Sequence, residues 1–266
     1  MIVFGEGMMK KEVVGIRNLN VSYGKKRVLS NVDLSIPDNV RCAIIGPNGA
    51  GKSTLIKAIL DLIEHDAASV KVLGKPLDEV RSRIAYVAQR SNANRDFPTT
   101  VFDTVLMGRY QHLGLFKRPG RRDREIALEA IREMRMEACL DRHISQLSGG
   151  QLQRVFIARA LCQDADLYIL DEPLAGVDEN TETIIMDTFI DLQKKGKTII
   201  AVHHDLSTIR HYFDYLVILN EEIKSHGPVE EVFTREQVDK AFKMEIDGRE
   251  DRKEWVARED NRLVYV

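Results

Sequence analysis

One stretch of the sequence, GPNGAGKS at Gly46–Ser53, combines residue types that can hold phosphate. It fits the pattern G-x-x-x-x-G-K-[ST] and lies between an apolar strand-like run and an amphipathic helical run. Glycines allow successive backbone N–H groups to turn toward phosphate oxygens, and the following helix adds its positive N-terminal end. Lys52 is expected to reach the β- and γ-phosphates, and Ser53 to ligate Mg²⁺. The sequence therefore predicts a nucleoside triphosphate site.

Two adjacent acids follow a second apolar run, in the stretch YILDEP. Ligands of open α/β sheets collect at the carboxyl ends of the strands, where Asp171 and Glu172 are expected. We expect Asp171 to hold Mg²⁺ through its water shell and Glu172 to polarise an attacking water molecule. Together with the phosphate loop, these acids predict hydrolysis of the bound nucleotide.

A second segment suited to an anion is LSGGQ, Leu147–Gln151, which precedes a helical run. Ser148 and the N–H groups of Gly149 and Gly150 at a helix start could supply donors and a dipole to a phosphate. The chain therefore has two candidate phosphate-binding segments.

A histidine pair ends another apolar run, in the stretch AVHHDL. Side chains alternate along a strand, so His203 and His204 are expected on opposite sides, and only one can face the nucleotide. A polar contact to the γ-phosphate is the favoured role. Zinc binding by His-His-Asp is an alternative, but adjacent strand residues cannot easily share one metal, and no partner cluster lies nearby in the sequence.

The elements that must position these residues can be predicted from apolar periodicity. Alternation over Val13–Ile36 predicts short antiparallel strands, and YLVILNEEIKSHG predicts a closing hairpin. RIAYVAQR predicts a strand that ends near Gln89, whereas DLYILDEP and KTIIAVHHD predict buried parallel strands. A helix that ends at Gly196 should separate the DLYILDEP and KTIIAVHHD strands. Residues from about Asp96 to Gln146 are predicted to form a helical insertion. The fold class is therefore α/β.

Composition sets limits on the class of protein. The chain has 266 residues, 44% of them hydrophobic, and a formal net charge of −2, which disfavours nucleic acid as a partner. The cysteines at 42, 139 and 162 have no CxxC spacing and are predicted to be small core residues in a reducing compartment. No signal peptide or membrane-spanning run is expected, so any spanning part must come from another subunit. The basic cluster FKRPGRRDR, Phe116–Arg124, is expected to be a solvated loop.

Taken in order, these motifs resemble the ATP-binding subunit of ABC transporters from about Val13 to Pro228. Tyr23 in VSYG matches the aromatic that stacks on adenine, and Gln89 in YVAQR matches the Q-loop glutamine. LSGGQ is the family signature, Asp178 in LAGVD matches the D-loop, and His204 matches the switch histidine. The phosphate loop corresponds to Walker A and LYILDEP to Walker B. One departure is Ala88, where relatives commonly have proline before the glutamine.

The resemblance implies a P-loop NTPase core with an antiparallel β subdomain and an α-helical subdomain. It predicts an ATPase domain over residues 13–228, with the helical part at about 96–160, after an N-terminal extension (1–12) and before a charged tail (229–266). ATP and Mg²⁺ are the implied cofactors. Catalytic roles are implied for Glu172 as general base, Lys52 in charge stabilisation, and Gln89 and His204 as γ-phosphate sensors. The implied Mg²⁺ ligands are Ser53, Gln89 and Asp171. The implied nucleotide-binding residues are Tyr23, Gly46, Pro47, Asn48, Gly49, Ala50, Gly51, Lys52, Ser53, Thr54, Ser148, Gly149, Gly150, Gln151 and Asp178.

The resemblance also implies partners. Two copies are expected to face head to tail, so that the signature of one closes over ATP held by the Walker A loop of the other. A separate multi-spanning permease would place the chain peripherally at the cytoplasmic face of the membrane. The stretch VHHDL is similar to the branch of importers of manganese, zinc or iron, which also use an extracytoplasmic metal-binding protein. Within that branch, FPTTVFDTVLMGRY is most similar to the manganese members.

Other classes remain open. An exporter subunit, or an importer of another substrate, shares every catalytic motif. A chromosome-maintenance ATPase would separate Walker A from the signature by a long coiled coil, and a soluble translation factor normally has two cassettes in one chain. The sequence has neither feature.

Overall fold

The computed structural model describes residues 11–89, 97–113, 117–242, 255–257 and 263–265. Residues 1–10 of the predicted N-terminal extension, the first residue of the expected helical insertion, Asp96, and part of the predicted charged tail lie outside the described residues. The chain forms two compact units, one of Met1–Glu79 with Ile200–Val266 and one of Val80–Ile199. The domain boundaries given above remain a proposal.

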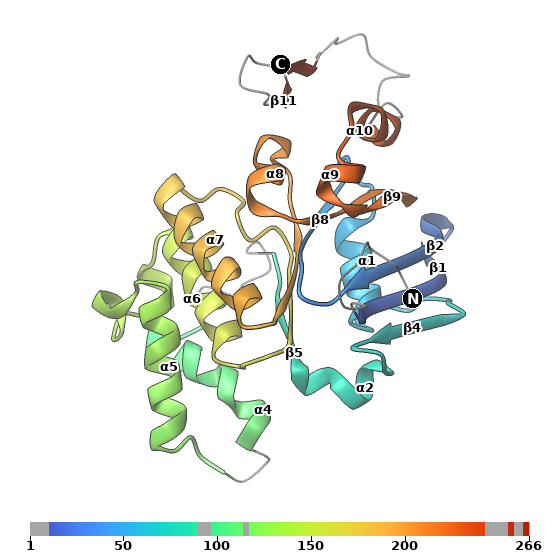
Figure 1. Ribbon diagram of the computed structural model, residues 1–266. Coiled ribbons are helices and arrows are strands. Elements are labelled where there is room, and N and C mark those ends of the chain that lie inside the picture. Colours follow the sequence, from blue (N-terminus) through green and yellow to red (C-terminus); the bar gives the residue numbers. More distant parts are fainter. Residues whose placement is uncertain (1–10, 90–96, 114–116, 243–254, 258–262, 266) are drawn as a thin grey trace. The chain divides into compact units, whose positions relative to one another are not determined.

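A three-stranded antiparallel sheet of order β2-β1-β4 begins the first unit (Figure 1). Its strands are β1 (Glu12–Tyr23), β2 (Lys26–Pro37) and β4 (Ser69–Val72). Val14 pairs with Ile36 and Ile16 pairs with Leu34 in the same register, and all four side chains are buried. The predicted antiparallel pairing is confirmed, but β1 and β2 have 12 residues each and are not short. Register shifts along the pair allow β1 and β2 to continue as long strands.

A second set of strands in this unit places the phosphate loop. β3 (Arg41–Ile45) runs parallel to β8 (Tyr215–Asn220), and β9 (Glu222–Pro228) returns antiparallel to β8. β3 and β8 are almost continuously buried, as expected for strands covered on both faces. Helix α1 (Lys52–Ile59) follows β3 and buries an apolar stripe that includes Leu55, Ile56 and Ile59. The predicted strand–loop–helix unit and the predicted hairpin are confirmed.

The chain after β9 is helical at first, as predicted, with α9 (Val229–Val232) and α10 (Arg235–Phe242). From the charge of this tail we expected no more than a plain helical appendage, and that expectation is wrong, because β10 (Trp255–Ala257) pairs antiparallel with β11 (Leu263–Tyr265). Both segments are rich in aromatic and β-branched residue types, which favour strands. Between β7 (Thr198–Val202) and β8 lie η6 (Leu206–Thr208) and α8 (Ile209–Tyr212).

In the second unit, β5 (Ile84–Val87) pairs in parallel with β6 (Leu167–Leu170), in register from Ile84–Leu167 onward. Helix α7 (Glu179–Lys194) follows β6 and ends before Gly196, whose φ of +79° favours glycine. β7 (Thr198–Val202) then begins in this unit and continues into the first. These elements match the predicted strands and helix.

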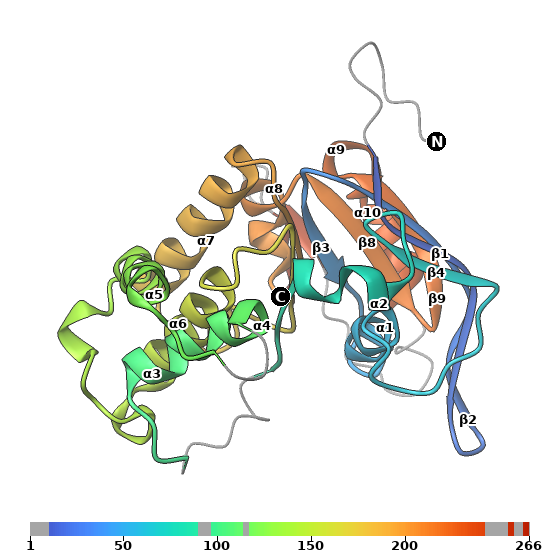
Figure 2. The same cartoon turned by 90° about the horizontal axis from the view of Figure 1, so that it is seen from below.

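The expected helical insertion is present between β5 and β6 (Figure 2). Helix α6 packs against α3, α5 and α7. At Gly108 the backbone approaches α6 so closely that a Cβ would lie 2.3 Å from the Arg159 carbonyl oxygen. The helices of this unit up to α6 are α2 (Leu77–Val80, which begins in the first unit), η1 (Arg81–Arg83), α3 (Val101–Leu106), η3 (Met107–Arg109), α4 (Tyr110–Leu113), α5 (Arg121–Glu133), η4 (Glu137–Cys139), η5 (Ile144–Gln146) and α6 (Gly149–Leu161).

All three cysteines are free and buried, which confirms their predicted place in the core. In the described part of the chain, each helix is too short or too polar to span a bilayer. The basic cluster agrees with expectation only in part: residues 117–120 lie in a mostly exposed loop, whereas residues 121–124 form the first turn of α5. Phe116 lies outside the described residues.

Candidate functional site

The phosphate loop connects β3 to α1 in the first unit. The Lys52 side chain is buried and donates hydrogen bonds from Nζ to the carbonyl oxygens of Gly46, at 2.7 Å, and Pro47, at 2.8 Å. The loop is therefore curled around an ammonium group, with Asn48 and Gly49 exposed at its tip. This arrangement concentrates positive charge at the start of α1.

Two glycines allow the loop to take this path. Gly51 is the N-cap of α1 with φ +95°, and a Cβ there would lie 2.6 Å from Leu29 Cδ2. At Gly46, φ is +156° and a Cβ would lie 2.0 Å from the Leu219 carbonyl oxygen. Any side chain at either position would displace β-strand neighbours.

The first turn of α1 contains no acidic residue, and its N-cap provides no side-chain hydrogen bond. A helix start of this kind can accept an anion. Ser53 and Thr54 are half-buried in that turn, and Tyr23 is exposed at the end of β1. An exposed phenol ring fits a stacking role better than a core role.

The histidine pair follows β7 in the first unit. His203 is buried and its Nε2 lies 2.8 Å from Thr208 Oγ1, whereas His204 is exposed. The predicted alternation is thus confirmed. Burial lowers the pKa of His203 to about 4, against an opposing effect of Asp205, so this ring is neutral at pH 7. His204 is left as the residue of the pair whose side chain reaches solvent.

The two acids follow β6 in the second unit, at the carboxyl end of the strand as predicted. The Asp171 amide donates to the Val87 carbonyl oxygen at 2.9 Å, and the Asp171 residue is 2% exposed. Burial and then the Asp171 carboxylate raise the pKa of Tyr86 on β5. Asp171 is therefore a buried acid at the strand end.

Glu172 is half-buried and its φ of +56° is unusual for a residue with a side chain. Gln89, at the end of the segment after β5, donates from Nε2 to Glu172 Oε2 at 2.7 Å. The structure thus brings together two residues that the sequence assigned separately to the Q-loop and to base catalysis.

The LSGGQ segment forms the start of α6. Ser148 is the N-cap: its Oγ accepts from the Gln151 amide at 3.3 Å, and Gln151 Oε1 accepts from the Ser148 amide at 2.9 Å. This reciprocal pair is a capping box, which fixes where the helix begins. Gly149 and Gly150 occupy its first two helical positions, where no residue of the turn is acidic.

Asp178 is the N-cap of α7 and lies beside this turn. Its carboxylate accepts from the amide and from the hydroxyl of Thr181, both at 2.9 Å, and these bonds hold the pKa of Asp178 below its usual range. A Cβ on Gly150 would lie 3.2 Å from Thr181 Oγ1 and 3.4 Å from Asp178 Oδ2. Thr181 was not singled out from the sequence, although the N-cap pattern D-x-x-T could have indicated it.

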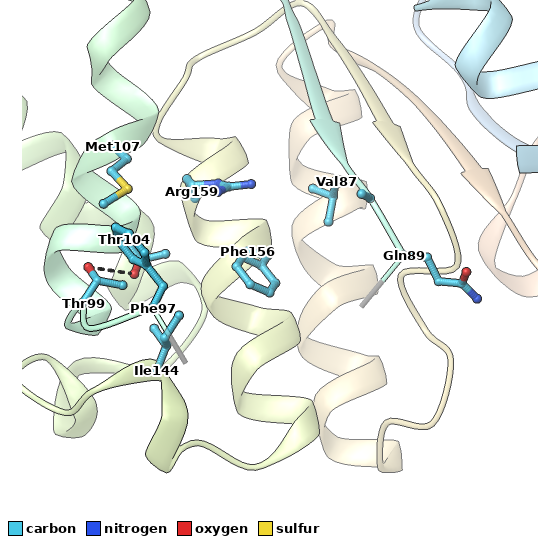
Figure 3. Close-up of a pocket in the computed structure, with 10 residues that line it drawn as sticks. Val87, Gln89, Phe97, Thr99, Thr104, Met107, Ile144, Phe156 and Arg159 are labelled. Carbon is cyan, nitrogen blue, oxygen red and sulfur yellow. Dashed lines mark hydrogen bonds between the residues drawn. The ribbon is translucent and has the colours of Figure 1, made fainter. Parts of the chain in front are cut away.

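A pocket of about 320 Å³ lies in the second unit beside Gln89 (Figure 3). Its wall is mainly apolar, and Gln89, Arg159 and two threonines supply the polar side chains. The lining residues are Val87, Ala88, Gln89, Phe97, Thr99, Thr104, Met107, Ile144, Phe156 and Arg159. Phe97 is exposed, as an aromatic residue in a docking groove would be.

The residue types in each unit are suited to the predicted cofactors. Ser53, Gln89 and Asp171 offer hydroxyl, amide and carboxylate oxygens, the hard ligands that Mg²⁺ prefers. The glycine-rich loop around Lys52 is suited to nucleotide phosphates. Within the described residues, no group of three or more His, Cys, Asp or Glu side chains could hold a metal ion, so a zinc site at the histidine pair gains no support.

Comparison with known proteins gives one consistent result. A family model described as ABC transporter matches residues 29–175. The zinc transport system ATP-binding protein TroB of Treponema pallidum is 53% identical over 229 residues, 86% of each chain. The manganese transport system ATP-binding protein MntB of Bacillus subtilis is 49% identical over 86% of this chain and 92% of its own.

Solved structures agree on the fold. The structure of cbiO1 from Clostridium perfringens, part of the ABC transporter complex cbiONQ, is 28% identical with a TM-score of 0.73. That match covers 89% of this chain and 96% of the other. The structure of an ATP binding subunit of an ABC transporter is 25% identical with a TM-score of 0.72, over 88% and 97% of the two chains.

Proposed function

The chain belongs to the ABC transporter family and is an ATPase that couples ATP hydrolysis to transport, and we propose that it powers uptake of a divalent transition metal. Manganese is the favoured cargo, and zinc or iron comes next. The observation that carries the proposal is the identity of 46–53% to curated relatives named as manganese or zinc transport ATP-binding proteins. The cargo itself would cross through another subunit and would not touch this chain.

We propose that ATP phosphates take the place of the loop carbonyls around Lys52. The ammonium group now holds two backbone oxygens, and it would exchange them for β- and γ-phosphate oxygens of higher charge. The loop N–H groups and the start of α1 would supply the remaining donors, and Tyr23 would stack on adenine. Bound Mg²⁺, held by Ser53, Gln89 and Asp171, would offset negative charge on the phosphates.

In the hydrolytic step, a water oxygen attacks the γ-phosphorus while the bond to the β–γ bridging oxygen breaks. Glu172 accepts the proton of the attacking water, and ADP leaves with the bridging oxygen. Lys52 stabilises the charge that develops on the phosphoryl oxygens. His204, exposed beside the buried His203, would contact the γ-phosphate, and Gln89 would sense its presence.

A second copy of the chain would complete each ATP site. Ser148, Gly149 and Gly150 at the start of α6 would close over the γ-phosphate bound by the partner copy, with Gln151 fixing the cap and Asp178 beside it. ATP would then hold the two copies together, and its hydrolysis would release them.

The pocket beside Gln89 is our proposed contact for the permease (Figure 3). Its volume and apolar wall suit a few side chains of a docked helix. Because Gln89 is in the wall, a change at the γ-phosphate would be felt at the permease contact. The chain would therefore work at the cytoplasmic face of the membrane. An extracytoplasmic metal-binding protein would deliver the metal to the permease and would be only an indirect partner of this chain.

The proposal is tested by deleting the reading frame and measuring cellular manganese, zinc and iron under metal limitation. We expect manganese to fall, and wild-type chain but not Glu172→Gln to restore it. A rise in cellular metal would show export. Unchanged content of all three metals, with ATPase activity intact, would contradict the proposed cargo.

A further inference from the structure

Five cations are exposed around the start of α5 in the second unit. We call this set the basic surface; it consists of Lys117, Arg118, Arg121, Arg122 and Arg124. In Figure 1 this end of α5 lies at the lower edge of the unit, next to α4. The concentration is local, because the whole chain has a net charge of −2.

Asp123, the one acid in residues 117–124, does not offset the positive charge of the basic surface. Asp123 Oδ1 is paired with Arg109 Nε at 3.1 Å, and the two side chains are only 15% and 13% exposed. The other Asp123 oxygen accepts from the Gly120 amide at 2.9 Å. A cation from η3 therefore neutralises this acid below the surface, and the five exposed charges remain.

The basic surface is little engaged by the rest of the protein. Arg121 pairs with Glu125 at 2.8 Å, but both side chains are well exposed, at 93% and 60%, where such pairs contribute little. The Arg124 guanidinium lies 5.8 Å from the centre of the Phe102 ring. Lys117, Arg118 and Arg122 form no ion pair with any residue that the structure describes.

The position of these cations is unfavourable for the helix itself. Arg121, Arg122 and Arg124 occupy the first turn of α5, where the helix dipole is positive and acidic residues are preferred. Folding of the isolated chain thus gives no reason for three arginines there, whereas binding to an anionic surface does.

The basic surface adjoins the helix that lines the pocket. Phe102, under Arg124, belongs to α3, and Thr104 on that same helix lines the pocket that we propose for the permease. A surface next to a permease contact would lie close to the bilayer.

We propose that the basic surface binds the anionic headgroups of the lipid bilayer beside the permease. Its cations are spread over a loop and a helix start without a cavity, which fits a charged plane better than a discrete ligand. Guanidinium groups also match phosphate geometry well. The location argument rests on the proposed function, but the binding itself is independent of the cargo and of ATP hydrolysis.

The experiment is sedimentation of the purified full chain with vesicles of phosphatidylcholine alone or with about 30% phosphatidylglycerol. We expect binding only to the anionic vesicles, with most of it lost between about 50 and 500 mM salt. The double variant R121Q/R122Q should bind about thirtyfold more weakly, at about 1 kcal/mol per cation. K194Q/K195Q, which removes two exposed lysines near the end of α7, should bind like wild type.

Unfolding cannot mimic the expected result, because removing cations from the start of α5 should leave the melting temperature equal or higher. Equal binding to both vesicle types, or equal loss in both double variants, would overturn the proposal. Tighter binding to an oligonucleotide than to anionic vesicles would also overturn it. ATPase activity in solution should be unchanged in R121Q/R122Q, so a failed proposed function and a failed lipid contact give different results.

Discussion

The amide Nε2 of Gln89 lies 2.7 Å from Oε2 of Glu172, so the residue proposed to sense the γ-phosphate is hydrogen-bonded to the proposed base. A carboxylate oxygen that accepts this bond is less available to accept a proton from water. The contact therefore describes a state in which Gln89 must turn away, or lengthen its bond, before Glu172 can act. The backbone of Glu172 is also in the left-handed region, with φ +56°, which is unusual for a residue with a side chain.

Two replacements of Gln89 should separate its role as a γ-phosphate sensor from its hydrogen bond to Glu172. In Gln89→Ala the hydrogen bond is lost, and we expect kcat to fall at least tenfold because γ-phosphate sensing is lost. ATP affinity should fall less, because Ser53 and Asp171 remain to hold Mg²⁺. In Gln89→Glu two carboxyl groups would meet at this short distance, which raises the pKa of one of them. The pH optimum of that variant should therefore move upward, as a pH profile of kcat would reveal. Identical profiles for Gln89→Glu and Gln89→Ala would argue against the contact.

Motif spacing predicted the parts of the site that are local in sequence. Gly46–Ser53 and the Asp171–Glu172 pair lie where the strand ends were expected, because each is fixed by the strand directly before it. The His203–His204 alternation followed from strand geometry in the same way. These features need only a few neighbouring residues.

The contacts between distant segments could not be predicted from the sequence. Gln89 and Glu172 are 83 residues apart, and their hydrogen bond depends on how β5 and β6 are paired. The approach of Thr181 to Gly150 depends on the packing of α6 against α7. Side-chain packing at that range is a property of the folded chain, and no local propensity encodes it.

The buried His203 should make stability depend on pH. Its folded pKa of about 4 is below the ordinary value of 6.5, so the unfolded chain binds the proton more readily. The free energy of unfolding should therefore fall as pH drops from 6.5 to 4, by up to about 3 kcal/mol, and should lose nothing above pH 6.5. Urea unfolding at pH 7.5 and 5 would measure this. His203→Gln should lose part of the dependence, since burial also lowers the pKa of His226, and His204→Gln, at the exposed position, should retain all of it.

The phosphate loop should reject a side chain at Gly46. Gly46→Ala places a Cβ against the Leu219 carbonyl oxygen. We expect the free energy of unfolding to fall by about 2 kcal/mol or more, and ATP binding to be lost as well. Gly24→Ala is the matched control, since its φ is also positive but nothing lies within 4 Å of the added Cβ. Urea unfolding should show the difference, and equal losses in the two variants would mean that the close approach has no consequence.

Thr181 should position Asp178 next to the signature helix. Thr181→Val keeps the side-chain shape and the hydrogen bond from the backbone amide to Asp178. It removes the hydroxyl that donates the second hydrogen bond to Asp178. We expect kcat to fall severalfold at unchanged ATP affinity of the monomer, whereas Thr181→Ser, which keeps the hydroxyl, should retain activity. Steady-state kinetics of both variants would check this. Equal losses in valine and serine variants would indicate that only packing matters.

Ser148 should affect dimerisation beyond its effect on the helix. In Ser148→Ala the N-cap hydroxyl is lost, which costs about 1 kcal/mol of stability, and the donor to the partner's γ-phosphate is lost with it. Gln151→Ala is the matched control, because it breaks the same capping box from the other side and leaves the serine hydroxyl in place. Dimerisation in the presence of ATP should be measured by sedimentation in chains that also carry Glu172→Gln. Ser148→Ala should weaken the dimerisation affinity at least tenfold, and Gln151→Ala much less. ATP binding by the monomer should be unchanged in both. If monomer binding fell as much as dimerisation, the signature would belong to the chain's own nucleotide site, and the shared site between two copies would be wrong.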